Sequence, residues 1–74
     1  MFRHLSDTRT DEGRVRVLID GASVLLRAET HAWQHDSAHA TLEDAALTLA
    51  LLPEIPQALY EQSLADIERY AHTD

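Results

Sequence analysis

Residues 14–27, Arg14-Val-Arg-Val-Leu-Ile-Asp-Gly-Ala-Ser-Val-Leu-Leu-Arg27, decide the fold class of this chain. Two β-prone runs flank Asp20-Gly21, and an Asp-Gly pair tolerates the positive φ angles that a type I′ turn needs at both central positions. The stretch therefore predicts a β-hairpin with Asp20-Gly21 as its two-residue loop.

This register sorts the side chains of the hairpin onto two faces, because alternate residues of a strand point to opposite sides. The apolar face pairs Ile19 with Ala22, Val17 with Val24, and Val15 with Leu26. The basic face pairs Leu18 with Ser23, Arg16 with Leu25, and Arg14 with Arg27. We expect the apolar face to pack on the rest of the protein.

The segments beside the hairpin carry weaker signals. A two-stranded ribbon is marginally stable alone in water, and residues 2–5 predict a third, edge strand. Residues 6–13, rich in Asp, Thr and Arg, predict a turn or loop. Residues 30–40 predict either a short helix or an irregular connection, with Trp33 anchoring it to the core.

The C-terminal part predicts two helices. Thr41 is the expected N-cap of a helix over residues 42–52, which is expected either to be the most buried element or to pack against a second chain. Pro56 fits the first turn of a second helix that runs to about His72. Its predicted inward face consists of Ile55, Leu59, Tyr60, Ser63, Leu64, Ile67 and Ala71.

These elements predict one small α+β domain over residues 1–74. Its expected fold is a two- or three-stranded antiparallel sheet, containing the hairpin of residues 14–27, packed against two C-terminal helices. A 74-residue chain buries only about 60% of its unfolded surface, which leaves room for a single thin core. We expect a cytoplasmic protein, because no apolar run is long enough for a signal segment or a membrane span.

Charge is unevenly distributed along the chain, whose formal net charge is −7. Residues 1–27 carry five arginines against four acids, whereas residues 28–74 carry one arginine against nine acids. A surface with this excess is steered toward cationic surfaces, including those with which proteins hold DNA or RNA. The sequence therefore predicts a non-catalytic module that blocks a basic, nucleic-acid-handling surface of a partner protein. The residues expected to bind that partner are Glu43, Glu54, Glu61, Asp66 and Glu68.

Nucleic-acid mimicry would require acids from both helices. Glu54, Glu61 and Glu68 recur every seven residues, and on one helix this spacing is about 10.5 Å along the axis. That distance exceeds the spacing between phosphates of one strand, so the acids of the two helices would have to interleave.

Two alternatives from other classes remain open. The Leu-rich helix of residues 42–52 could make the chain a homo-oligomeric structural or accessory subunit, and a homodimer is then expected. Arg14, Arg16 and Arg27 could instead bind an anion such as a nucleic-acid backbone. The net charge opposes direct binding of nucleic acid, and Glu12 or Glu29 could neutralise these arginines.

No pattern in the chain predicts an enzyme, a metal or a cofactor. His31, His35 and His39, with Asp36 nearby, would converge on a cation only if their segment were helical, and solvated imidazoles are the simpler interpretation. The four serines lack a nucleophile-elbow sequence, and the two glycines form no phosphate-binding loop. The absence of cysteine excludes thiolate metal ligands and a cysteine nucleophile.

In its general character the chain is similar to small phage-encoded proteins that block host defence systems, including anti-CRISPR proteins. The likeness rests on small size, acidity, absence of a catalytic motif, and a hairpin followed by helices. It involves no shared motif and assigns no site residue. It implies an inhibitor that acts by binding.

Overall fold

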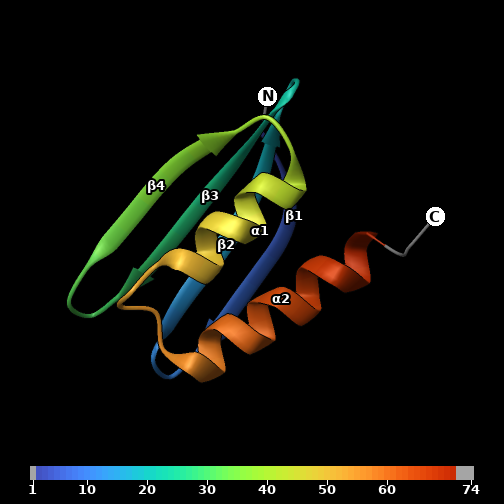
Figure 1. Ribbon diagram of the computed structural model, residues 1–74. Helices are drawn as coiled ribbons and strands as arrows, with labels where there is room; N and C mark the ends of the chain where they lie inside the picture. The colour runs from blue at the N-terminus through green and yellow to red at the C-terminus, as the bar shows by residue number, and fades with distance from the viewer. Residues whose placement is uncertain (1, 72–74) are drawn as a thin grey trace.

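The structure is a computed structural model that describes residues 2–71 (Figure 1). Its four strands follow one another as an antiparallel sheet in the order β1-β2-β3-β4, and two helices complete the chain. The elements are β1 (Phe2–Thr10), β2 (Gly13–Asp20), β3 (Ser23–Thr30), β4 (Gln34–His39), α1 (Leu42–Leu51) and α2 (Gln57–Ala71).

The α+β class is confirmed, but the sheet has one strand more than the two or three expected. The prediction of an edge strand near the N-terminus is confirmed, and β1 continues to Thr10 through a bulge between His4 and Ser6. The prediction of a turn or loop over residues 6–13 is wrong in its first half, because pairing with β2 extends the strand to a two-residue connection at Asp11 and Glu12.

Residues 34–39 form β4, so both the helix and the irregular connection expected there are wrong. The segment Gln-His-Asp-Ser-Ala-His has none of the residues with high β-propensity, Val, Ile, Thr, Phe, Tyr and Trp, and it becomes a strand by pairing with β3. Trp33 lies partly buried against the core, as expected, and its indole N–H donates to the Glu54 carbonyl at 3.1 Å.

The predicted hairpin is present, but its loop is Gly21-Ala22. Gly21 has a φ of 61° at the first central position, the arrangement of a type II′ turn, and Asp20 pairs with Ser23. Each β2 residue therefore faces a partner two positions further along β3, so that Val17 faces Leu26. A two-residue shift keeps every side chain on its predicted face, because the period of a strand is two.

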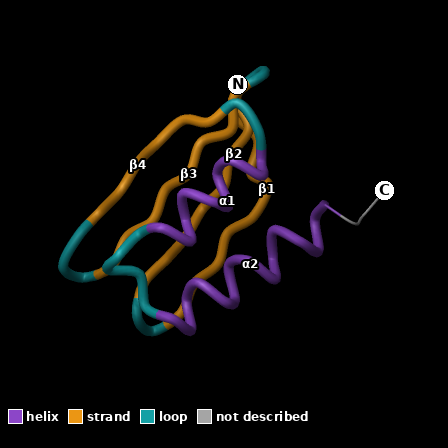
Figure 2. Tube along the Cα trace, in the orientation of Figure 1, coloured by secondary structure: helices purple, strands orange, loops and turns teal. Residues whose placement is uncertain are grey.

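Both helices cover one face of the sheet, which we call the helix side (Figure 2). α2 packs chiefly on β1, and α1 packs on β3 and β4. The core lies between these layers and consists of Val15, Val17, Val24, Leu26, Ala28, Ala45, Leu49, Leu59 and Ile67. The opposite side of the sheet, the open face, carries no helix among residues 2–71.

The helices begin close to where the sequence predicts. Thr41 caps α1 by accepting a hydrogen bond from the Asp44 backbone N–H at 3.1 Å. The expectation that this helix is the most buried element is wrong, since Leu47 and Leu51 are 59% and 71% exposed. On α2 the expected inward face is confirmed at Leu59, Ser63 and Ile67, which are buried, whereas His72 and the side chain of Ala71 lie outside the described part of the chain.

Candidate functional site

The three arginines proposed as an anion site lie on the open face, each beside a carboxylate of the same chain. Arg14 binds Asp7 through two hydrogen bonds of 2.9 and 2.7 Å. These bonds lower the pKa of the Asp7 carboxyl below its ordinary value and raise that of the guanidinium. The arrangement resembles a closed ion pair more than an open phosphate-binding site.

The other two arginines are neutralised in the same way at longer range. Arg16 lies 3.7 Å from Glu29, and Arg27 lies 3.6 Å from Asp36. Glu29 is one of the two carboxylates expected to compensate them. Arg16 faces Arg27 in the observed register, which places two like charges opposite each other. A carboxylate on a neighbouring strand compensates each of them, Glu29 on β3 for Arg16 and Asp36 on β4 for Arg27.

The five acids predicted to bind a partner lie on or between the helices, but they are not equivalent. Glu43, Glu54, Glu61 and Glu68 are exposed, and Glu54 precedes α2 instead of continuing its ridge. Asp66 is half-buried and accepts a hydrogen bond from Thr8 of β1 at 2.5 Å. The structure therefore separates four exposed carboxylates from one that joins α2 to the sheet.

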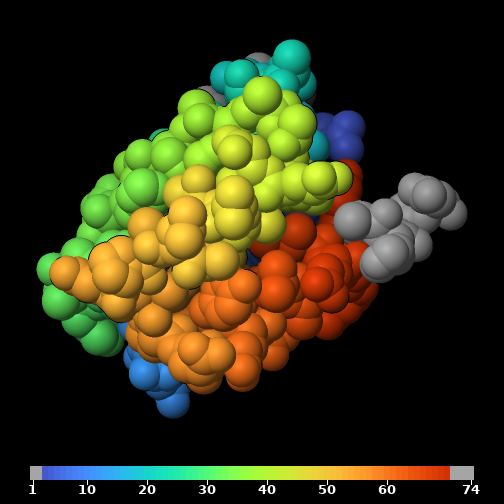
Figure 3. Space-filling model, in the orientation of Figure 1, coloured from blue at the N-terminus to red at the C-terminus, as the bar shows by residue number. Residues whose placement is uncertain are grey.

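The outward surface of α1 combines apolar and acidic side chains. Glu43, Leu47 and Leu51 follow one another at four-residue intervals and lie on the same side of the helix. We call these three residues the α1 stripe. The exposed Glu54 follows three residues later, and α1 contains no basic residue. Figure 3 shows this side of the molecule, with α1 and α2 next to each other at the surface.

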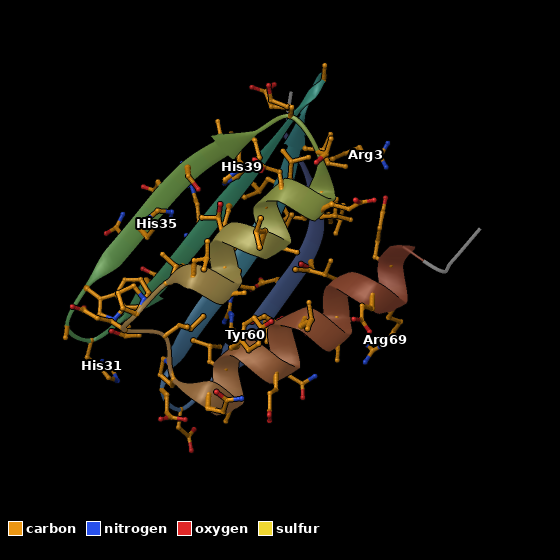
Figure 4. All side chains as sticks on the ribbon, in the orientation of Figure 1. Arg3, His31, His35, His39, Tyr60 and Arg69 are labelled. Atoms are coloured by element: carbon orange, nitrogen blue, oxygen red, sulfur yellow. The ribbon has the colours of Figure 1, made fainter. Side chains whose placement is uncertain are left out.

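A second constellation lies on the helix side of β4, where Figure 4 labels His35 and His39. Ser37 Oγ lies 3.0 Å from His35 Nε2 and 2.6 Å from His39 Nε2. His39 Nδ1 lies 2.8 Å from Oδ2 of Asp44 in the first turn of α1. We call these four residues the β4 chain. It connects β4 to α1 by hydrogen bonds in series.

The direction of the hydrogen bonds in the β4 chain depends on the tautomers of His35 and His39. When Asp44 is ionised it only accepts, and a neutral His39 ring then carries its proton on Nδ1 and donates it to the carboxylate. Nε2 of His39 then accepts from the Ser37 hydroxyl, and Ser37 in turn accepts from Nε2–H of His35. All four groups are satisfied with both imidazoles neutral.

The metal arrangement considered for this segment does not form in the described structure. His31 precedes β4, and Asp36 points to the open face, away from His35 and His39. Within residues 2–71 no three His, Asp or Glu side chains gather closely enough to hold a metal ion. The sequence predicted a helix or an irregular connection here, and in neither do these histidines converge on Ser37. Their convergence needs the i, i+2, i+4 spacing of a strand.

Neither of the two helices within residues 2–71 has the length and apolar composition needed to cross a lipid bilayer. Comparison of the chain with protein-family models, curated proteins and solved structures found no match.

Proposed function

We propose that this chain is an acidic binding protein that occupies a basic, nucleic-acid-handling surface of a partner protein. The contact is made by the α1 stripe together with Glu54, Glu61 and Glu68. Its mode of action is steric and electrostatic, as in small phage-encoded anti-defence inhibitors, and its place of action is the cytoplasm.

The segregation of charge between the two sides of the sheet carries this proposal. On the open face, arginines and carboxylates are equal in number, since Arg9, Arg14, Arg16 and Arg27 accompany Asp7, Asp20, Glu29 and Asp36. Residues 42–71 instead carry six carboxylates, from Glu43 to Glu68, and the single arginine Arg69. The excess negative field therefore comes from the helix side, where it attracts a cationic surface.

The exposed leucines favour a docking face over a surface that is acidic only for solubility. Leu47 and Leu51 offer apolar area that gains free energy when it is removed from water, at about 25 cal/mol per Å². Acids lie at both ends of this apolar patch. A partner that presents an apolar patch rimmed by Arg or Lys is complementary to both properties.

The acids at both ends of the exposed leucines weigh against a homodimer through α1. Antiparallel packing of two α1 helices places Glu43 of one copy near Glu54 of the other, and parallel packing places identical acids together. Like charges at such spacing destabilise the pairing, and α1 supplies no basic residue to compensate them. A cationic partner removes this repulsion, whereas a second copy increases it.

The test compares two variants of equal net charge. The double variant Glu61→Gln with Glu68→Gln removes two negative charges from the helix side. The control, Gln34→Lys with Ala38→Lys, adds two positive charges to the open face of β4 and so changes the net charge by the same amount. Proteins captured from a host extract at about 0.1 M salt are identified, and the association of the purified partner is then measured. We expect the first variant to slow association about tenfold and the control to have little effect.

Salt dependence and competition complete this test. Raising the salt from about 0.1 M to about 1 M shortens the screening length from about 10 Å to about 3 Å and should release the partner. The released partner should regain binding to DNA or RNA. Equal slowing by both variants, or a partner that binds nucleic acid while the chain is attached, would contradict the proposal.

A further inference from the structure

We propose that the β4 chain is an acyl-transfer site in which Ser37 is the nucleophile and the substrate is a carboxylic ester with a small apolar acyl group. The inference does not depend on the proposed binding function, which uses other side chains of the helix side. It departs from the expectation of no enzymatic activity, which rested on the lack of a nucleophile-elbow sequence.

Ser37, His39 and Asp44 have the order and distances that activation of a serine requires. The hydroxyl lies 2.6 Å from Nε2 of His39, within reach for removal of its proton. The other ring nitrogen lies 2.8 Å from the Asp44 carboxylate, which fixes the tautomer and stabilises the imidazolium formed during reaction. Asp44 is therefore a positioning residue, itself held by the capped first turn of α1.

His35 supplies the fourth component of the site. Its Nε2 lies 3.0 Å from Ser37 Oγ and donates to it when the ring carries its proton on Nε2. When Oγ bonds to a carbonyl carbon, the new oxyanion lies one bond beyond Oγ. The Nε2–H of His35 can then move its hydrogen bond from the hydroxyl to the oxyanion, as side-chain donors do in other acyl-transfer sites.

Burial fits these separate roles. The side chain of His39 is 8% exposed, which shelters the base from water, while Ser37 and His35 are half-buried. β4 is one of the two edge strands of the sheet, so a substrate approaches Ser37 from the side. A hollow of about 200 Å³ adjoins His35, and its size suits a short acyl group. Its other lining residues are Trp33, Gln34, Leu52, Pro53 and Glu54.

The reaction balances without a redox partner. As Ser37 Oγ bonds to the carbonyl carbon, its proton moves to His39 Nε2, and the carbonyl π electrons form the oxyanion that His35 stabilises. Collapse of this intermediate breaks the bond to the alcohol oxygen, which takes the proton from His39. Water then attacks the acyl-serine by the same route, which releases the carboxylic acid and restores the hydroxyl.

The decisive experiment labels the unmodified chain with a fluorophosphonate and locates the adduct by peptide mass spectrometry. We expect a single adduct on Ser37, and we expect p-nitrophenyl acetate to give a burst of one p-nitrophenol per chain. Ser37→Ala should remove both signals, whereas Ser23→Ala, at an exposed serine of the hairpin, should retain them. No adduct on Ser37, or an equal burst from Ser37→Ala, would overturn the proposal.

Two further variants assign the supporting roles by the labelling rate of Ser37. His39→Gln should slow labelling by about 10²–10⁴-fold because the general base is lost. Asp44→Asn should slow it while Ser37 and His39 remain, and it should change the pH dependence of labelling, which a merely structural role would not do. Each variant is compared with the wild type only after its thermal unfolding has been measured, and labelling of folded His39→Gln at the wild-type rate would refute the assignment.

Discussion

Removal of the Asp66 carboxylate should weaken the attachment of α2 to the sheet, although the sequence assigned this residue to partner binding. Thr8 is 2% exposed and donates its hydroxyl to Asp66, so Asp66→Ala leaves a buried donor without an acceptor. Such a loss costs about 1–3 kcal/mol. Arg69, whose side chain is 74% exposed, adds at most about 1 kcal/mol through its contact of 3.4 Å with Asp66.

Thermal unfolding followed by circular dichroism measures this effect. For a domain of this size 1 kcal/mol corresponds to roughly 4–8 °C in Tm, so we expect Asp66→Ala to lower Tm by roughly 5–20 °C. The control, Glu68→Ala, removes an exposed carboxylate from the same helix and should change the free energy of unfolding by less than about 0.5 kcal/mol. Adding Thr8→Val to Asp66→Ala should recover stability, because no orphaned hydroxyl remains. Equal Tm values for the two alanine variants would refute the reasoning.

Three other perturbations test separate parts of the structure. The Arg14 hydrogen bond lowers the pKa of Asp7 below 3.8 in the folded protein. The pair therefore stabilises the fold at any pH above the pKa that Asp7 has in the unfolded chain, and this contribution is lost as the pH falls through the folded pKa. The urea midpoint of Asp7→Asn should accordingly fall less on acidification than that of the wild type. Gly13→Ala should cost about 1–3 kcal/mol in urea unfolding, since a Cβ there would collide with the Glu29 carbonyl oxygen, and an unchanged midpoint would contradict this packing. Val17→Asp buries a charge at a position that is 0% exposed and should abolish cooperative unfolding, whereas Leu51→Asp, at 71% exposure, should keep it; a folded Val17→Asp would show that the core is wrongly placed.

The elements specified by local patterns were predictable from the sequence. The hairpin follows from a glycine turn between alternating apolar residues, and α1 follows from the cap at Thr41. The hairpin loop lies one residue later than predicted. Asp20-Gly21 in a type I′ turn and Gly21-Ala22 in a type II′ turn both place glycine at a position that needs a positive φ. Local sequence identifies the glycine, whereas the pairing of the two strands selects the turn.

β4 could not be predicted, because its sequence is polar on both faces. Its inward residues are His35, Ser37 and His39, so no apolar alternation distinguishes the side that faces the helices. The segment is a strand because it completes the hydrogen bonding of β3, a long-range requirement. The candidate chemistry of Ser37 was hidden for the same reason, since its two imidazoles converge only when alternate residues share a face.

Topology converts the uneven charge of the sequence into a difference between the two sides of the molecule. Four strands joined by short turns use the first 39 residues, and both helices then pack on one face, so the acids after residue 40 gather there. The arginines of the hairpin remain on the open face, where neighbouring strands supply carboxylates at distances of 2.7 to 3.7 Å. Residues 42–71 carry a single arginine, Arg69, and six carboxylates, so the helix layer keeps an excess of negative charge. A cationic partner that covers α1 and α2 would compensate the carboxylates of the helix side, as the arginines of the sheet compensate the carboxylates of the open face.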